Sequence, residues 1–242
     1  MIGVLLAGGE GRRLKPLTDT IPKAMAVIAG KPVLEHNLDL LAAAGITESI
    51  VSVYYKKEKV IEYFTHAKKN ITQPHFHVQE RLRGSAGDLK DIRADIRGPF
   101  VVMYADNFSN CNLKPVLKFH ALGNQIATIV LFHRDRNKHS GIAGGCVRFD
   151  QVTHAILEFI EGEGAVTPFI NAGIYVVDPK ILQFIPDEGT YDFGKDLFPA
   201  LIQARERLAG YLMPQEEFLF GLDTLECYEQ AVEFTRSVHY HE

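Results

Sequence analysis

The chain has 242 residues, of which 46% are hydrophobic, and its formal net charge at pH 7 is −4. This length and composition suffice for one domain with a substantial core, and the acidic balance argues against a general nucleic-acid binder, because such proteins carry a basic face. We expect no membrane partner, because no apolar run approaches the roughly 18 residues of a membrane span and no secretory signal is recognisable. Cys111, Cys146 and Cys227 lack zinc-ligand or CxxC spacing, which indicates free thiols in a reducing, cytoplasmic location.

Short apolar strands alternate with amphipathic helices in the first half of the chain. The expected order is strand 2–6, helix 33–44, strand 49–54, helix 56–69, strand 75–79, helix 86–95 and strand 100–104. This alternation predicts an α/β fold with three layers: a Rossmann-like, mostly parallel twisted sheet with helices on both faces. Ligands of such sheets bind beyond the carboxyl ends of the strands.

The second half of the chain is richer in strands. A helix at 113–122 and a strand at 126–133 are followed by glycine-separated strands at 145–149, 154–160 and 170–177. The predicted order ends with a helix at 193–208, strands at 210–213 and 218–222, and a helix from about Thr224.

A glycine-rich turn and a series of cations follow the first strand. Gly8, Gly9 and Gly11 can adopt positive φ and let backbone N–H groups approach an anion closely. The cations that could supply counter-charge are Arg12, Arg13, Lys15, Lys23 and Lys31. The spacing of these cations favours a polyphosphate site over a tight turn with solvated basic residues.

Two common phosphate-binding loops do not fit this segment. A P-loop needs two glycines separated by four residues and followed by Lys and Ser or Thr, and the segment lacks that spacing. A dinucleotide fingerprint would have its third glycine at Leu14 and open a helix there, but Pro16 and Pro22 would break that helix. The second strand also ends without an acidic residue to bind a ribose. An NAD-dependent enzyme is therefore disfavoured.

One segment, residues 6–32, matches a known signature at more than ten positions in order. The matching residues are Leu6-Ala7-Gly8-Gly9-x-Gly11-x-Arg13-Leu14-x-Pro16-Leu17-Thr18, then Pro22-Lys23 and Gly30-Lys31-Pro32. Later segments agree as well: Gly84 to Gly87, Tyr104 to Asn107, Asn171 to Tyr175, Asp192 to Asp196, and Asp223-Thr224. The chain resembles the sugar-1-phosphate nucleotidylyltransferases, similar to thymidylyl- and cytidylyltransferases for glucose 1-phosphate and to guanylyltransferases for mannose or heptose 1-phosphate.

The resemblance implies an enzyme of the nucleotidyltransferase class. In such enzymes a sugar-1-phosphate oxygen attacks the α-phosphate of a nucleoside triphosphate in line, and catalysis consists of positioning two anions and neutralising charge. By resemblance, Arg13 would hold the triphosphate, Lys23 would contact phosphate near the reacting centre, and Asp106 would complete the catalytic set. The nucleotide would also be bound by the glycine turn, namely Leu6, Ala7, Gly8, Gly9, Gly11 and Arg12.

Two aspartates match the family's metal ligands. Asp106 follows an apolar strand, so its carboxylate is expected at a strand end, where Mg²⁺ would find the hard oxygen ligands that it prefers. Asp223 is the second candidate, although many members read Asp-Ile-Gly-Thr where this chain has Gly221-Leu222-Asp223-Thr224. A turn or helix cap is the alternative role for both aspartates. The cofactor expected from the resemblance is Mg²⁺.

The base would be bound near Gln79, Gly84 and Ser85. Gln79 precedes Gly84 by five positions, as in relatives that use UTP or dTTP, and a glutamine amide can donate to O4 and accept from N3–H. The sequence thus predicts uracil or thymine. Tyr104 and Asp223-Thr224 resemble cytidylyl enzymes, and Asp192 to Asp196 resembles guanylyl enzymes, so those bases stay open.

Four residues match positions that line the sugar in the family: Gly145, Glu161, Asn171 and Gly173. Where the family has Glu-Lys-Pro, this chain reads Glu161-Gly162-Glu163, so the lysine that meets the sugar phosphate is missing. Either a cation such as Arg134, Arg136 or Lys138 replaces it, or the acceptor is an unusual one.

We predict one nucleotidyltransferase domain over 1–242, with a nucleotide-binding core at 1–135, a small strand-rich sugar-binding insertion at 136–222, and a C-terminal helix and tail at 223–242. Its partners would be a nucleoside triphosphate and a sugar 1-phosphate, without nucleic acid, and a homo-oligomer stays open. The alternatives are a non-sugar acceptor such as choline phosphate and a non-catalytic, nucleotide-binding regulator.

Overall fold

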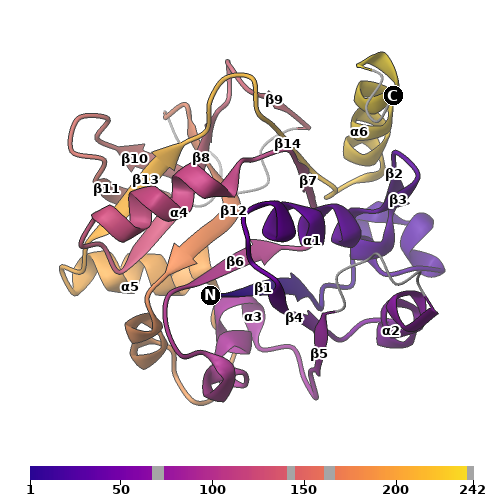
Figure 1. Cartoon of the computed structure of the whole chain (residues 1–242), viewed down its shortest axis with the longest axis horizontal. Coiled ribbons are helices and arrows are strands. Elements are labelled where there is room, and N and C mark those ends of the chain that lie inside the picture. The colour runs from indigo at the N-terminus through magenta and orange to yellow at the C-terminus, as the bar shows by residue number, and fades with distance from the viewer. Residues whose placement is uncertain (67–73, 141–144, 161–166, 239–242) are drawn as a thin grey trace.

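The computed structural model describes residues 1–66, 74–140, 145–160 and 167–238 (Figure 1). The strands are β1 (Ile2–Ala7), β2 (Val27–Ile28), β3 (Lys31–Pro32), β4 (Glu48–Val53), β5 (His75–Val78), β6 (Phe100–Tyr104), β7 (Asn107–Ser109), β8 (Ala127–His133), β9 (Lys138–His139), β10 (Cys146–Phe149), β11 (Ile156–Ile160), β12 (Phe169–Val177), β13 (Leu208–Leu212) and β14 (Phe218–Gly221). The α-helices are α1 (Val33–Ala43), α2 (Lys57–His66), α3 (Gly84–Gly87), α4 (Leu113–Leu122), α5 (Phe198–Gln203) and α6 (Leu225–Ser237). Short 3₁₀ turns are η1 (Arg12–Leu14), η2 (Leu17–Asp19), η3 (Lys23–Met25), η4 (Asp88–Lys90), η5 (Arg93–Asp95) and η6 (Pro179–Phe184), and η7 (Phe193–Leu197) is a π turn.

A nine-stranded sheet forms the centre of the described structure. Its main path runs β11-β10-β12-β6-β1-β4-β5, and β8 and β13 extend it from β12. β6, β1, β4 and β5 are mutually parallel, and β13 is parallel to β8. β12 runs antiparallel to β6, β8 and β10, and β11 runs antiparallel to β10. All of these strands except β11 and β12 therefore point the same way, which confirms the mostly parallel sheet expected from the sequence.

Helices cover both faces of this sheet, as predicted. Because successive strand residues point to opposite faces, Leu5 of β1 packs on one side and Val4 on the other. One core contains apolar side chains of α1, α2 and α4, among them Leu38 and Phe64. The opposite core contains those of α3, η7 and α5, including Phe198. The sheet is thus the middle of three layers.

A smaller sheet attaches the C-terminal helix to the N-terminal loop. β14 pairs with β7 and β9, and the side chains of Phe108 and Phe220 join Ala231 of α6 in a third core. Leu14 of η1 is fully buried in the same cluster. In Figure 1, α6 lies beside β2 and β3 at one end of the molecule. No helix within the described ranges is long and apolar enough to cross a membrane.

Two predicted helices are wrong in extent. The segment expected to be one helix at 86–95 forms α3, η4 and η5, because the N–H of Asp91 donates to Asp88 O, three residues back, and Ile92 has a φ of −100° and a ψ of 8°, outside the α-helical region. The helix expected at 193–208 starts as a π turn and ends at Gln203, and Arg205 has a φ of 61°. A helix cannot continue through such a residue, so β13 begins at Leu208, earlier than expected.

Candidate active site

The loop after β1 is shaped around Gly11. Gly11 has a φ of 63°, and a Cβ on it would lie 2.9 Å from Thr18 Cγ2 and 3.1 Å from Lys23 Cβ. The Thr18 hydroxyl donates to Gly11 O at 2.9 Å and closes the loop. A glycine is needed here because the backbone is left-handed and Lys23 passes directly above it. The loop thereby carries Lys23 back to the end of β1.

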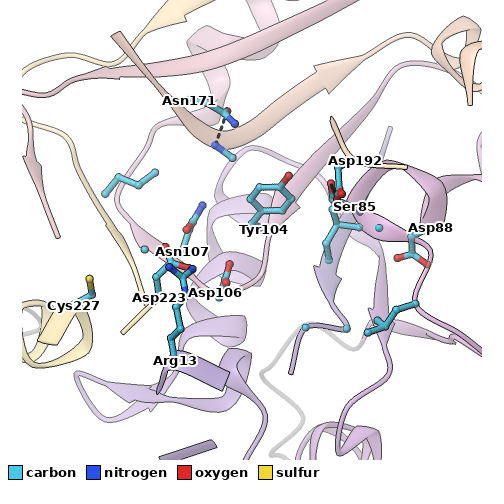
Figure 2. A pocket seen from close by; sticks show the side chains of 18 of the residues that line it. Arg13, Ser85, Asp88, Tyr104, Asp106, Asn107, Asn171, Asp192, Asp223 and Cys227 are labelled. Atoms are coloured by element: carbon cyan, nitrogen blue, oxygen red, sulfur yellow. Dashed lines mark hydrogen bonds and ion pairs between the residues drawn. The ribbon is translucent and has the colours of Figure 1, made fainter. Parts of the chain in front are cut away.

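Lys23 connects two aspartates that are far apart in the sequence. Its ammonium lies 2.5 Å from Asp106 Oδ2 and 2.8 Å from Asp223 Oδ1. Arg13 Nη2 also donates to Asp223 Oδ1, at 3.2 Å. The Lys23 side chain is 12% exposed, whereas the Arg13 side chain is 68% exposed. We call Lys23, Asp106 and Asp223 the Asp–Lys–Asp cluster. Figure 2 shows Arg13 beside the two aspartates of this cluster.

Backbone pairing brings the two aspartates together. Asp106 follows β6, and in the antiparallel pair β7–β14, Asn107 faces Gly221. The pairing continues for one step, because the N–H of Leu222 donates to Asp106 O at 3.1 Å. Asp223 is the next residue, so the strand register fixes its carboxylate beside Asp106.

The two carboxylates keep Lys23 charged. Burial alone would lower the pKa of the Lys23 ammonium, but Asp106 and Asp223 outweigh it and raise that pKa above its ordinary value. A lysine whose folded-state pKa is raised contributes stability throughout the neutral range and loses it only as the pH rises through that pKa. The Lys23 ammonium is therefore charged at physiological pH.

The donor set suits Mg²⁺. Asp106 and Asp223 both direct a carboxylate oxygen at one point, the Lys23 ammonium, and each is partly exposed, at 28% and 21% of its side chain. Mg²⁺ prefers hard oxygen ligands and commonly uses one or two carboxylates together with phosphate oxygens. These residues fit the metal site expected from the sequence.

The cluster lies at one side of a pocket of about 710 Å³ at the carboxyl edge of the sheet. We call this cavity the main pocket. The side around the cluster, which we call the cationic side, is lined by Gly8, Gly9, Arg13, Asp106 and Asp223. Figure 2 shows Ser85, Asp88 and Asp192 on the opposite side, with Tyr104 between the two groups.

The side around Ser85 is built from two backbone segments held together. Gly84 has a φ of 77°, and a Cβ on it would lie 2.6 Å from Tyr191 O. The N–H of Tyr191 donates to Arg83 O at 2.8 Å. Gln79 also lines this side, and its Nε2 donates to Ser52 Oγ at 2.8 Å. The predicted base-binding residues Gln79, Gly84 and Ser85 thus come together in the pocket wall.

Asp88 is a buried carboxylate in the same wall. Its side chain is 3% exposed, and neither oxygen has a hydrogen-bond partner of good geometry in the described parts of the chain. Desolvation raises the pKa of Asp88 to about 6, although nearby Ser52 offsets part of the shift. His77 Nε2 lies 4.0 Å from Asp88 Oδ1, too far for a hydrogen bond. Keeping this carboxylate ionised therefore costs folding free energy.

The third side of the pocket is formed by β12. Asn171 donates from Nδ2 to the Tyr175 hydroxyl and accepts from the N–H of Gly173, both at 2.9 Å. Gly173 has a φ of 68°, and a Cβ on it would lie 2.6 Å from a ring carbon of Tyr104. The sheet register shifts between Asn171 and Tyr175, so the strand bulges into the pocket.

Not every predicted site residue lines the main pocket. Those that do are Leu6, Gly8, Gly9, Arg13, Gln79, Gly84, Ser85, Asp106, Asn171, Gly173 and Asp223. Arg12 pairs with Glu10 at 2.6 Å, and Ala7 is buried in the core beneath. Gly145 supports Asn171, whose N–H donates to Gly145 O at 3.0 Å. Glu161 lies outside the described residues.

The remaining predicted cations are placed away from the pocket lining. Lys15 pairs with Asp19 at 2.9 Å, and Lys31 pairs with Asp39. The three candidate substitutes for the missing lysine, Arg134, Arg136 and Lys138, do not belong to the described lining of the main pocket.

Sequence reasoning missed several lining residues, namely Asp88, Tyr104, Asn107, Ser140, Thr190, Asp192 and Cys227. The sequence contained a signal for three of these residues, because they lie in segments that match the family. Tyr104 and Asn107 flank Asp106, and Asp192 is the first residue of the Asp192 to Asp196 segment. For Asp88 there was none, because an aspartate in a predicted amphipathic helix is expected on its solvated face.

The fold and this pocket are typical of α/β proteins that bind phosphorylated ligands at the carboxyl edge of the sheet. A family model described as "Nucleotidyl transferase" matches residues 2–218. The chain belongs to this family. It is 33% identical over 219 residues to the UTP–glucose-1-phosphate uridylyltransferase of Synechocystis sp., covering 84% of this chain and 56% of the relative. It is 32% identical over 225 residues to the mannose-1-phosphate guanyltransferase of Schizosaccharomyces pombe, covering 88% and 60%.

The chain thus spans less than two thirds of these curated relatives. Solved structures agree in fold over their whole length. HddC from Yersinia pseudotuberculosis, complexed with GMP-PN, matches with a TM-score of 0.78 and 24% identity, over 96% of this chain and 98% of its own. A putative glucose-1-phosphate thymidylyltransferase from Bacillus anthracis matches with a TM-score of 0.83 and 18% identity, over 100% and 98%.

The buried Asp88 gives a prediction about stability. Its pKa rises from 3.8 to about 6 on folding, so the folded protein binds more protons between these values and stability falls as the pH rises through them. The replacement Asp88→Asn removes that cost and should stabilise the protein by about 3 kcal/mol above pH 6, by the usual conversion of a pKa shift. The gain should be smaller at pH 5, as measured by urea unfolding of both proteins at pH 5 and pH 8.

The matched control is Asp91→Asn. Asp91 Oδ1 accepts from Arg83 Nη1 at 2.6 Å, so removing its charge should give no gain at either pH. An Asp88→Asn protein no more stable than the parent at pH 8 would show that this carboxylate is not a cost to the fold.

Proposed function

We propose that the protein is a sugar-1-phosphate nucleotidylyltransferase. It would transfer a nucleotidyl group from a nucleoside triphosphate to a sugar 1-phosphate and release pyrophosphate. The observation that carries the proposal is the Asp–Lys–Asp cluster beside Arg13 and the glycine turn. Two carboxylates directed at one point suit a metal ion, and two cations beside them suit phosphate oxygens. A protein that only bound a nucleotide would not need all of these groups.

The reaction forms a bond between a phosphate oxygen of the sugar 1-phosphate and the α-phosphorus. The bond from that phosphorus to the bridging oxygen breaks, and pyrophosphate leaves with the electron pair. The backbone of Gly8 and Gly9 and the guanidinium of Arg13 would hold the triphosphate, and Asn171 with Gly173 would hold the sugar. Their work is to align two repelling anions, which can supply a large part of the rate enhancement.

The arrangement of charges suggests how Arg13 and Lys23 would come to bind phosphate oxygens. Arg13 and Lys23 both donate to Asp223 Oδ1. Asp106 and Asp223 would hold Mg²⁺, which when bound neutralises charge on the phosphoryl oxygens and on the departing pyrophosphate. With Asp223 as a metal ligand, Arg13 and Lys23 would be available to hold phosphate oxygens. The same two cations would thus stabilise the free site and the developing charge of the reaction.

Three further assignments belong to this proposal. Residues 1–135 would form the nucleotide-binding core, 136–222 the sugar-binding part, and 223–242 the C-terminal helix and tail. Gln79 favours uracil or thymine, while guanylyl and cytidylyl transfer are the alternatives. Cys111, Cys146 and Cys227 are free thiols, which supports a reducing, cytoplasmic location.

The activity can be tested with a substrate panel. Each nucleoside triphosphate is incubated with Mg²⁺ and a set of hexose, amino-sugar and heptose 1-phosphates, and pyrophosphate release is followed. We expect release with at least one pair, dependent on the acceptor and abolished by EDTA. If no sugar 1-phosphate supports release while the nucleotide still binds, the acceptor or the catalytic assignment is wrong.

Lys23 gives a sharper prediction. The variant Lys23→Ala should lower kcat by about 100-fold or more, because it removes a charge directed at the reacting phosphates. The matched control is Lys15→Ala in the same loop, whose ammonium pairs with exposed Asp19. That variant should keep kcat within about twofold, since exposed ion pairs contribute little. Equal turnover of the two variants would remove Lys23 from the reaction, and urea unfolding shows whether each is folded.

A further inference from the structure

The side of the main pocket around Ser85 is lined by hydrogen-bond acceptors. Asp88 and Asp192 contribute carboxylates to it, and Gln79 contributes an amide. Arg13 is the only arginine or lysine in the described lining of the pocket, and it lies at the cationic side. Figure 2 shows Asp88 and Asp192 together near Ser85, well separated from Arg13 and Asp223. We call this part of the wall the acceptor side, because its charge favours ligand groups that donate hydrogen bonds.

Asp192 is held in one orientation by Ser85. Its Oδ1 accepts from the Ser85 N–H at 3.0 Å and from the Ser85 hydroxyl at 3.1 Å. No described residue donates a hydrogen bond to its Oδ2, and the residue is half-buried in the pocket wall. A carboxylate with one oxygen fixed by the protein presents the other to a ligand without losing side-chain entropy on binding.

The backbone around Asp192 is equally well fixed. The Asp192 N–H donates to Asp196 Oδ2 at 2.7 Å, and Tyr191 O accepts from two N–H groups of α3. The close approach of Gly84 to Tyr191 allows this arrangement. The segment with Asp192 and the turn with Gly84 and Ser85 therefore act as one rigid wall, which is what discrimination between similar ligands requires.

Two neighbours place further acceptor oxygens behind the surface of this wall. Gln79 donates its Nε2 to Ser52, and its buried Oε1 has no partner among the described residues. Asp88 adds a buried carboxylate behind the surface. Asp88 lies close to His77 and to Asp91, and Asp91 is paired with Arg83. A fold that keeps such a carboxylate at a pocket gives up stability there, as binding sites commonly do.

We propose that the acceptor side binds the nucleobase and selects guanine, with Asp192 Oδ2 accepting hydrogen bonds from its N–H groups. The proposal rests on the proposed function only in taking the main pocket as a nucleotide site, with phosphates at the cationic side. It departs from the uracil or thymine expected from Gln79, because the carbonyl oxygens of those bases would face the carboxylate of Asp192 in the wall.

The pattern of donors on the bases supports this choice. Guanine presents two neighbouring donors, N1–H and the N2 amino group, to which a carboxylate binds well. Adenine and cytosine each present a ring-nitrogen acceptor beside their amino group, and this acceptor would face a carboxylate oxygen. Uracil and thymine present one N–H between two carbonyl oxygens. Guanine is thus the base whose donors match an acceptor-lined wall.

The test uses Asp192→Asn. An asparagine at this position can still accept from Ser85 through its Oδ1, and it places an amino group where Oδ2 was, so the fold is kept while one acceptor becomes a donor. The matched control is Asp196→Asn, which removes the same charge from the same turn, lies outside the described pocket lining, and can still accept from the Asp192 N–H through its amide oxygen. Calorimetry would measure the binding of GTP, ITP, ATP, CTP, UTP and dTTP, each with Mg²⁺ and without any sugar phosphate. ITP lacks only the N2 amino group of GTP.

The parent protein and the Asp196→Asn control should bind GTP more tightly than ITP and the other nucleotides. Asp192→Asn should bind GTP about 10- to 100-fold more weakly, the usual effect of losing a hydrogen bond to a charged group, and should lose the preference over ITP. Tighter binding of UTP or dTTP by the parent would overturn the proposal. So would an equal loss for all nucleotides in Asp192→Asn, because the carboxylate would then serve a ribose hydroxyl.

These outcomes are independent of the transferase assay. A guanine preference that depends on Asp192 would stand even if no sugar 1-phosphate supported pyrophosphate release, and only the proposed function would then fail. Conversely, turnover with UTP and without a guanine preference would keep the proposed function and refute the guanine assignment.

Discussion

The ion pairs of Lys23 with Asp106 and Asp223 are the constraint on which the site depends. They join the loop after β1, the end of β6 and the start of α6. These three segments are far apart in the sequence and belong to different secondary-structure elements. Each carboxylate alone would be an ordinary polar group at the end of a strand. Brought together they would repel each other, and the buried ammonium is what makes their proximity tolerable. The raised pKa of Lys23 shows that the attraction outweighs the cost of burying its charge.

The rest of the fold can be understood as support for this arrangement. The parallel strands β1 and β6 end at the same edge, so Gly8 and Asp106 lie close together. The small sheet of β7 and β14 then returns the chain to this edge, and its aromatic cluster with α6 holds Leu14 of the loop. Because the third core contains both the N-terminal loop and α6, the cationic side of the pocket is anchored by packing as well as by charge.

Whether a feature of the fold or the site could be predicted from the sequence depends on how far apart in the chain the interacting residues lie. The order of strands and helices followed from hydrophobic periodicity, and the match to the family signature singled out Arg13, Lys23, Asp106 and Asp223. The acceptor side was not predictable in the same way. Asp192 meets Ser85 across more than a hundred residues. The first turn of α3 donates hydrogen bonds to Tyr191 O, an equally distant partner. Periodicity describes local structure, so it could indicate neither this contact nor the burial of Asp88.

The main pocket separates two kinds of charge, and this separation orients a ligand. The cationic side offers Arg13 and the backbone of the glycine turn, whereas the acceptor side offers Asp88 and Asp192. A nucleotide has its negative charge at one end and hydrogen-bond donors on its base at the other, so only one orientation satisfies both sides. In the reverse orientation the phosphates would face two carboxylates, a repulsion strengthened by the low dielectric constant around buried Asp88. Under the proposed guanine assignment, the acidic wall would contribute to alignment in two ways, by attracting the base and by excluding the triphosphate from the wrong end.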